Sequence, residues 1–185
     1  MSQARVEPIM DARAVDETLQ RMAEKIVAQH GVEDLALVGI RTRGVPLAQR
    51  LAVRIRAAVT TELPVGTLDI NLYRDDLSTI ADHPVLRKTE IPFKVEGRKV
   101  ILVDDVLFTG RTVRAALDGI VDLGRPAFIR LAVLVDRGHR ELPIAADIVG
   151  RVVDTAPDQE VRVHLEEVDG RDEVLLVDAE DRGAA

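Results

Sequence analysis

The 185-residue sequence contains no cysteine and no tryptophan, and Tyr73 is its one tyrosine. Without cysteine the chain has no disulfide and no zinc–thiolate site, and catalysis by a thiolate is excluded. Aromatic side chains that could stack on nucleic-acid bases are scarce. A formal net charge of −7 argues against a protein that coats nucleic acid, although a local basic patch is compatible with it.

Long apolar runs are also missing. No stretch approaches the length that spans a bilayer, and segment 1–10 lacks the apolar core of a signal peptide. Apolar residues make up 46% and charged residues 31% of the chain, as is typical of a globular protein, and we expect a cytoplasmic one. The length favours one domain, 1–185, that buries a sizeable core.

Apolar residues recur at helical spacing in some segments and form short continuous or alternating runs in others. The pattern predicts helices at 15–26, 48–59 and 113–121, and strands at 35–40, 68–72, 100–103 and 131–135. Such alternation indicates an α/β fold with a mainly parallel central sheet flanked by helices. Near the C-terminus, Val161, Val163 and Leu165 alternate with charged residues, and Asp169-Gly170 offers a turn. We therefore expect an antiparallel hairpin at about 160–178.

The predicted strand 100–103 is followed by Asp104 and Asp105, and then by Thr109-Gly110-Arg111-Thr112 at the start of a helix. Ligands of open α/β sheets bind at the carboxyl ends of strands, and a helix N-terminus holds phosphate through free N–H groups. Carboxylates cannot bind phosphate, but they accept hydrogen bonds from sugar hydroxyls. The pattern predicts a sugar-phosphate site. A solvated strand end, a helix cap or a metal-binding acidic pair are the alternatives.

Two other segments lie at the same predicted edge of the sheet. Arg41-Thr42-Arg43-Gly44 follows strand 35–40, and its guanidinium groups suit a polyanion such as pyrophosphate, whereas a solvated turn is the alternative. Segment 73–92 has no clear periodicity, which is typical of a lid or of an inert surface loop.

The apolar strand, the two acids, three further residues and Thr-Gly-Arg-Thr resemble the motif by which type I phosphoribosyltransferases bind 5-phosphoribosyl-1-pyrophosphate (PRPP). The likeness covers about 10–177, and its clearest segments are 37–44, 69–77, 100–112 and 131–143. It is strongest to the uracil phosphoribosyltransferases that regulate pyrimidine operons. The resemblance implies the type I fold, conversion of uracil and PRPP to UMP and pyrophosphate, Mg²⁺ carried mainly by PRPP, and a homodimer or higher homo-oligomer.

Roles for individual residues follow from this resemblance. It implies that Asp104 and Asp105 bind the ribose hydroxyls and that they are catalytic residues together with Arg137. The substrate-binding residues that it implies are Arg41, Thr42 and Arg43 for pyrophosphate, Arg74 in a flexible hood at about 73–92, and Val106, Leu107, Phe108, Thr109, Gly110, Arg111 and Thr112 for the 5-phosphate. It implies no metal-ligating residue.

The same resemblance implies UMP-dependent binding to pyrimidine leader mRNA and hence transcription attenuation. The candidate RNA-binding residues are Arg21, Lys25 and Arg151, with Arg13 and Arg140 as further basic positions. No RNA-binding module is visible in the residues themselves, and Asp16, Glu17 and Glu24 stand among these bases. A phosphoribosyltransferase without an RNA role, and a nucleotide sensor with little turnover, remain alternatives.

Overall fold

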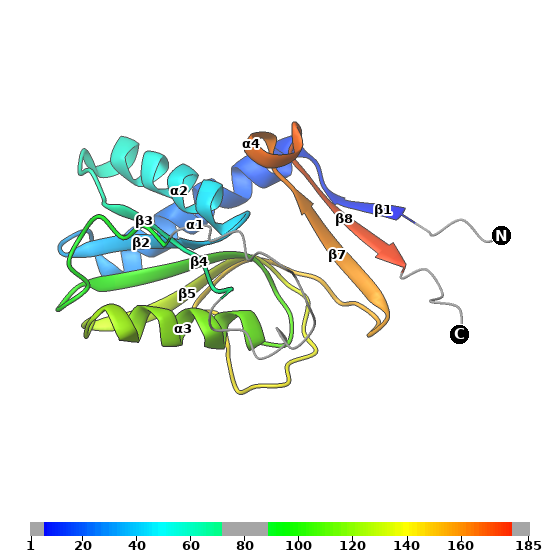
Figure 1. Cartoon of the computed structure of the whole chain (residues 1–185). Coiled ribbons are helices and arrows are strands. Elements are labelled where there is room, and N and C mark those ends of the chain that lie inside the picture. Colours follow the sequence, from blue (N-terminus) through cyan, green and yellow to red (C-terminus); the bar gives the residue numbers. More distant parts are fainter. Residues whose placement is uncertain (1–5, 72–88, 179–185) are drawn as a thin grey trace.

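The structure is a computed structural model of the whole chain, and it describes residues 6–71 and 89–178 (Figure 1). The strands are β1 (Val6–Met10), β2 (Leu35–Ile40), β3 (Val65–Leu68), β4 (Lys99–Leu107), β5 (Phe128–Asp136), β6 (Ile148–Val152), β7 (Gln159–His164) and β8 (Glu173–Asp178). The helices are α1 (Ala12–His30), α2 (Gly44–Val59), α3 (Arg111–Leu123) and α4 (Glu166–Asp169). None of these helices is long and apolar enough to cross a membrane.

Within the described residues, five parallel strands form the central sheet in the order β3-β2-β4-β5-β6. The chain moves from β2 outward to β3 and then returns to β4 on the other side of β2. The order therefore reverses between β2 and β4, and in doubly wound sheets such a switch point is where ligands bind. The predicted α/β fold with a mainly parallel sheet is confirmed.

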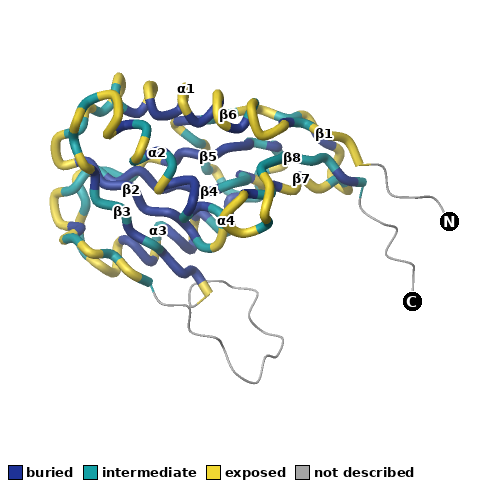
Figure 2. Tube along the Cα trace, turned by 90° about the horizontal axis from the view of Figure 1, so that it is seen from above, coloured by how far each residue is buried: buried dark blue, intermediate teal, exposed yellow. Residues whose placement is uncertain are grey.

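Helices α1 and α2 cover one face of the central sheet, and α3 covers the other (Figure 1). All six residues of β2 are buried, as expected of a strand covered on both faces, and Figure 2 shows the buried strands running between the helices. Helix α1 presents an apolar stripe to the sheet, and Asp11 caps its start by accepting a hydrogen bond from the Ala14 N–H at 2.8 Å.

A second, antiparallel sheet has the order β1-β8-β7, and its side chains Val161, Val163 and Val174 join the core that includes the apolar face of α1. The predicted hairpin is thus present as β7 and β8. The connection between β7 and β8 is longer than the expected turn at Asp169-Gly170, because it contains α4. Gly170 ends this helix with φ +73°. Strand β1 was not predicted; its five residues include Pro8 and give little alternation.

Several strand boundaries differ from the prediction. The strand predicted at 68–72 shares only Leu68 with β3, which begins at Val65 and ends where Asp69 turns the chain: the Asp69 Oδ1 accepts from the Asn71 N–H at 3.0 Å. Strand β4 continues to Leu107 rather than ending at Val103, because it keeps β5 as a partner along this length. Asp104 and Asp105 therefore lie within a strand, and the predicted loop shortens to 108–110.

Candidate functional site

The acidic pair lies at the switch point of the central sheet. Strand β2 pairs with β4 only as far as Gly39 and Val103, so the next residue of β4, Asp104, begins where this neighbour ends. Each carboxylate folds back on its own strand: Asp104 Oδ1 accepts from the Asp105 N–H at 2.9 Å, and Asp105 Oδ1 accepts from the Val106 N–H at 2.9 Å. The strand thus fixes two carboxylates next to each other at the ligand-binding edge.

Burial dominates the electrostatics of Asp104. The Asp104 side chain is only 6% exposed, and its burial raises its pKa well above the ordinary value of 3.8, with a further contribution from the negative charge of Asp105. A hydrogen-bond donor or a cation placed against the Asp104 carboxylate would stabilise its charged form. Sugar hydroxyls and a bound Mg²⁺ are ligands of that kind.

A short turn, 108–110, joins β4 to α3 and forms the candidate phosphate site. Gly110 stands at the N-cap of α3 with φ +91°, a conformation that favours glycine. Thr109 Oγ1 accepts from the Arg111 N–H at 3.3 Å, and Thr112 is half-buried in the first helical turn. The first turn of the helix thus combines backbone N–H groups that have no partner within the helix with threonine hydroxyls, a suitable arrangement for an anion.

Arg140 fixes the position of this turn through hydrogen bonds. Its Nη2 donates to both carboxylate oxygens of Asp136 at 2.6 Å, and its Nη1 donates to the Phe108 carbonyl oxygen at 2.8 Å. The backbone adds two contacts, because the N–H groups of Glu141 and Leu142 both donate to the Thr109 carbonyl oxygen. The segment after β5 therefore fixes the backbone of the phosphate turn. Arg140 was a candidate for RNA contact, and the structure instead engages it inside the protein.

The turn 41–44 lies directly against β4, which carries Asp104 and Asp105 and is called the acidic strand below. A Cβ atom at Gly44 would lie 2.4 Å from the Val103 carbonyl oxygen and 3.3 Å from Asp104 Cα, so α2 begins in contact with β4. Arg41 is half-buried and Thr42 is exposed. The charge of Asp105 contributes to the raised pKa of Arg43, although the hydrogen bonds that Arg43 donates to Asp169 are the largest cause. The structure thus brings this turn and the acidic pair together.

Arg137 lies against Phe108, the first residue of the phosphate turn. It is 6% exposed, and its guanidinium carbon sits 3.9 Å from the centre of the Phe108 ring. Its Nη2 donates to the Ala156 carbonyl oxygen at 3.3 Å, while Nε is buried without a hydrogen-bond partner, and burial lowers its pKa. His139 stacks edge-on against the same Phe108 ring. Phe108, Arg137 and His139 thus pack together where β5 ends next to the phosphate turn.

The other predicted residues divide into two groups. Arg74 and the hood, up to residue 88, lie outside the described residues. Arg21 and Lys25 are exposed on α1, and Arg151 is exposed on β6. These elements adjoin, because a Cβ at Gly150 would meet Thr18 and Met22 of α1. The three bases thus belong to neighbouring elements, although Arg151 also donates from Nη1 to the Ile9 carbonyl oxygen at 2.6 Å.

Sequence reasoning missed several contacts of the site. Asp169 binds Arg43, Asp136 binds Arg140, and Phe108 stacks under Arg137. The first partnership joins residues 126 positions apart, and no local pattern marks it. The pair Asp136 and Arg140 has the spacing of a helical ion pair but joins the last residue of β5 to the loop that follows it, so only the turn geometry reveals it. Within the described ranges, no three His, Asp or Glu side chains gather as metal ligands would.

Comparison with known proteins places this arrangement in a class. Residues 6–167 match the family of the phosphoribosyl transferase domain. A solved hypoxanthine phosphoribosyltransferase from Staphylococcus aureus has a TM-score of 0.69 at 17% identity, and the match covers 96% of this chain and 94% of that one. A hypoxanthine phosphoribosyltransferase from Trypanosoma cruzi has a TM-score of 0.69 at 14% identity, covering 94% and 97%. The fold, a parallel central sheet flanked by helices with a separate antiparallel sheet, is that of a type I phosphoribosyltransferase.

Much closer relatives share one name. "Bifunctional protein PyrR" of Pelotomaculum thermopropionicum is 57% identical over 92% of this chain and 94% of that protein. The proteins of the same name from Deinococcus radiodurans (55%, covering 94% and 95%) and Thermus thermophilus (57%, covering 93% and 96%) are similarly alike. The chain belongs to the PyrR family of phosphoribosyltransferase-domain proteins.

Proposed function

We propose that this protein transfers the phosphoribosyl group of PRPP to uracil, giving UMP and pyrophosphate, and that it regulates pyrimidine operons by binding leader mRNA in a UMP-dependent way. One observation carries the enzymatic part: the acidic strand, the phosphate turn and the arginine turn 41–44 meet at the switch point of the sheet. The high identity to PyrR proteins supports uracil as the base and the regulatory role. The structural neighbours at 17% identity and below support the fold alone.

The proposed binding mode assigns one part of PRPP to each segment. The 5-phosphate would lie against Thr109, Gly110 and the first turn of α3, and the ribose hydroxyls would donate to Asp104 and Asp105. Arg41 and Arg43 would flank the pyrophosphate. The base would lie towards β5, beside Arg137.

In the reaction, the bond between ribose C1 and the pyrophosphate oxygen breaks, and the electron pair leaves with pyrophosphate. The N1 atom of uracil then forms the new bond to C1, and its proton passes to solvent. Positive charge develops on the sugar, and the buried carboxylate of Asp104 would stabilise it next to Asp105. Positioning and electrostatics suffice for such a transfer, so the proposal assigns no covalent nucleophile.

Mg²⁺ fits the proposed site. The adjacent carboxylates of Asp104 and Asp105 offer the oxygen ligands that Mg²⁺ prefers, and the ion commonly completes its shell with water and substrate oxygens. When bound with PRPP, the ion supplies positive charge to the leaving pyrophosphate. Asp104 and Asp105 would hold the ribose edge of that complex, and Arg43 would face its pyrophosphate edge.

The test is a base panel with Mg²⁺ and PRPP. We expect uracil to be converted to UMP in preference to hypoxanthine, adenine or orotate, as measured by separation of the nucleotide products. The control is the double variant Asp104→Asn, Asp105→Asn, which should remove the activity seen with uracil. Equal or better turnover of a purine base would contradict the uracil assignment.

The regulatory part of the proposal includes further features. The RNA surface would contain Arg21, Lys25 and Arg151, and it would be completed in a homodimer or higher homo-oligomer. Residues 73–92, with Arg74, would act as a hood over PRPP. The chain would function as one phosphoribosyltransferase domain, because side chains of both sheets share one core. Its location would be the cytoplasm.

A further inference from the structure

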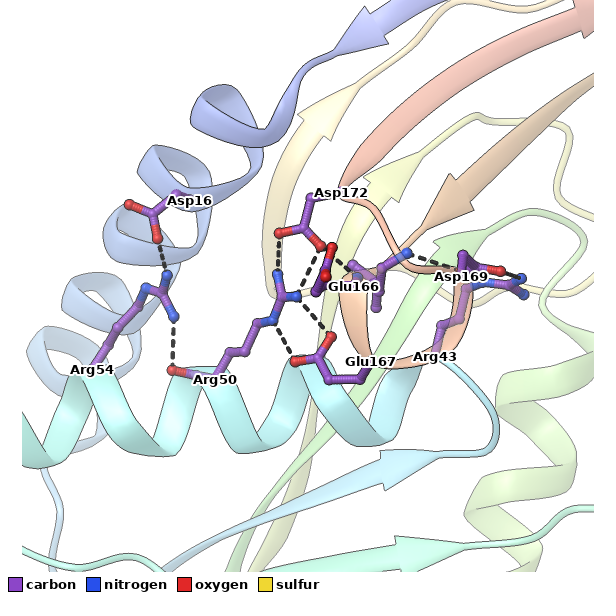
Figure 3. A network of polar contacts seen from close by, with 9 residues as sticks. Asp16, Arg43, Arg50, Arg54, Glu166, Glu167, Asp169 and Asp172 are labelled. Atoms are coloured by element: carbon purple, nitrogen blue, oxygen red, sulfur yellow. Dashed lines mark hydrogen bonds and ion pairs between the residues drawn. The ribbon is translucent and has the colours of Figure 1, made fainter.

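Arg43 of the arginine turn is held by Asp169, a residue of α4 far along the sequence (Figure 3). Arg43 Nε donates to Asp169 Oδ2 at 3.0 Å, and Nη2 donates to Oδ1 at 2.8 Å. Two parallel hydrogen bonds of this kind fix both the position and the plane of a guanidinium group. The contact therefore determines where Arg43 can place its remaining donors.

Asp169 is itself held in place. Its Oδ2 also accepts from the Leu165 N–H at 2.9 Å, and the Leu165 side chain is fully buried in the core. The Asp169 side chain is 18% exposed, compared with 32% for Arg43. The hydrogen bonds from Arg43 lower the pKa of Asp169 to about 2, so the carboxylate stays charged throughout the neutral range. A fixed and permanently charged group suits an anchoring role.

The ion pair leaves Arg43 able to bind an anion. A guanidinium group has five N–H donors, and Asp169 takes one from Nε and one from Nη2. Three donors remain, and the side chain is partly exposed on the turn that faces the acidic strand. Without Asp169, a long and flexible arginine side chain would lose more rotamer freedom on binding its ligand.

The same short segment has a second and separate attachment. Arg50 of α2 binds Glu167 and Asp172, with nitrogen–oxygen distances of 2.7 Å to each (Figure 3). These ion pairs hold the region of α4 to α2 without touching Arg43. They provide a matched control, because a substitution there loosens the same segment and leaves the Arg43 contact intact.

We propose that Asp169 is a positioning residue, which orients Arg43 for the pyrophosphate group of PRPP. This inference rests on the proposed function of the arginine turn. It connects the antiparallel sheet to the reaction, because the stretch between β7 and β8 supplies the group that aligns a pyrophosphate-binding side chain.

The experiment measures pyrophosphate handling in Asp169→Asn, which keeps the shape of the side chain and removes its charge. In the reverse reaction, from UMP and pyrophosphate, we expect KM for pyrophosphate to rise about tenfold while kcat stays within about twofold. Asp169→Glu keeps the charge on a longer arm and should give a rise of about threefold. The control Asp172→Asn should lower the melting temperature and leave KM unchanged.

A double-mutant cycle with Arg43→Ala tests the mechanism. If Asp169 acts through Arg43, then Asp169→Asn adds no further loss once Arg43 is removed. An equal loss in both backgrounds, a rise in KM with Asp172→Asn as large as that with Asp169→Asn, or tighter pyrophosphate binding in Asp169→Asn would each overturn the proposal. If Asp169→Asn does not fold, the threefold rise expected of Asp169→Glu decides the question.

Failure of the proposed function gives a different result. In that case wild-type protein forms no UMP from uracil and PRPP. Binding of Mg²⁺-pyrophosphate, measured by calorimetry on the same variants, then decides the role of Asp169. Weaker binding in Asp169→Asn with normal binding in Asp172→Asn supports the inference, and unchanged binding overturns it.

Discussion

Arg140 and Asp136 form an ion pair in which one nitrogen, Arg140 Nη2, lies 2.6 Å from each oxygen of the Asp136 carboxylate. The same guanidinium group donates to the carbonyl oxygens of Phe108, Gly138 and Ile144. One side chain thus ties the end of β5 to the turn that precedes α3. Since that turn is the candidate 5-phosphate site, the pair links substrate binding to the loop after the neighbouring strand.

The first prediction concerns this link. Arg140→Lys keeps the positive charge but cannot reproduce a planar fork that serves several acceptors at once. We expect KM for PRPP to rise about tenfold, because the phosphate turn is no longer fixed. Steady-state kinetics with varied PRPP measures it.

Glu141→Gln is the matched control for Arg140→Lys. Glu141 forms an ion pair with Arg111 in the same segment, but both side chains are largely exposed, and such pairs contribute little. Its KM for PRPP should stay within about twofold of wild type. A similar effect of both variants would mean that the segment is sensitive to any substitution, rather than that Arg140 fixes the turn.

A second prediction concerns the contact between α2 and β4. Gly44→Ala would place a methyl group 2.4 Å from the Val103 carbonyl oxygen, which is backbone and cannot move away cheaply. We expect a loss of stability of about 2 kcal/mol or more and a fall in kcat/KM, because α2 must shift away from Asp104. Urea unfolding and steady-state kinetics measure the two effects.

Gly97→Ala separates this clash from a general effect of replacing glycine. Gly97 has φ +71° and open space around it, so alanine there costs about 1 kcal/mol of backbone strain without a steric clash. Its kcat/KM should remain normal. Normal activity of Gly44→Ala as well would show that the spacing between the arginine turn and the acidic strand is unimportant.

The sequence predicted the three central strands β2, β4 and β5, because these strands are apolar and the helices between them have apolar stripes at regular spacing. The outer strand β6 was not predicted, and the strand predicted at 68–72 shares only Leu68 with β3. The sequence also indicated the acidic pair and the phosphate turn, since both occupy consecutive positions. Neither the contact of Asp169 with Arg43 nor that of Phe108 with Arg137 could be predicted in this way. Each depends on the packing of loops that are distant in sequence, and side-chain pairing of this kind has no periodicity. The end of β4 was misplaced because Asp104 and Asp105 interrupt an apolar pattern without interrupting the pairing with β5.

A third prediction concerns the buried carboxylate. The folded protein raises the pKa of Asp104, so its charge destabilises the fold once pH exceeds the ordinary aspartate value of 3.8. The stabilising contribution is complete below that pH and is lost as pH rises through the raised value. Asp104→Asn, which stays neutral, should therefore be more stable than wild type at pH 7, and this advantage should disappear as pH approaches 3.8.

Urea unfolding at several pH values measures the effect. Asp158→Asn makes the same substitution at an exposed position and is the control, whose stability should stay close to that of wild type. Catalytic activity should fall, whereas the stability of Asp104→Asn at pH 7 should rise. The double variant Asp104→Asn, Asp105→Asn should lose about 10²-fold in turnover, as is typical when a transition-state contact is removed. A double variant with wild-type kinetics would exclude the ribose role of the pair.

The last prediction concerns RNA. Arg21 and Lys25 are exposed on α1, and Arg151 follows Gly150 on the strand that packs against the same helix. RNA affinity depends strongly on phosphate contacts, so each lost contact weakens binding and flattens its salt dependence. We expect Arg21→Ala and Lys25→Ala each to weaken UMP-dependent binding of a pyrimidine leader RNA severalfold while uracil transfer stays normal. Arg151→Ala is less informative, because Arg151 also holds the Ile9 carbonyl oxygen. Arg114→Ala on α3, which covers the opposite face of the sheet, is the control and should bind normally. Wild-type protein that retains no leader RNA at low salt with UMP present would show that the basic residues of α1 are solvated surface and that the protein is an enzyme alone.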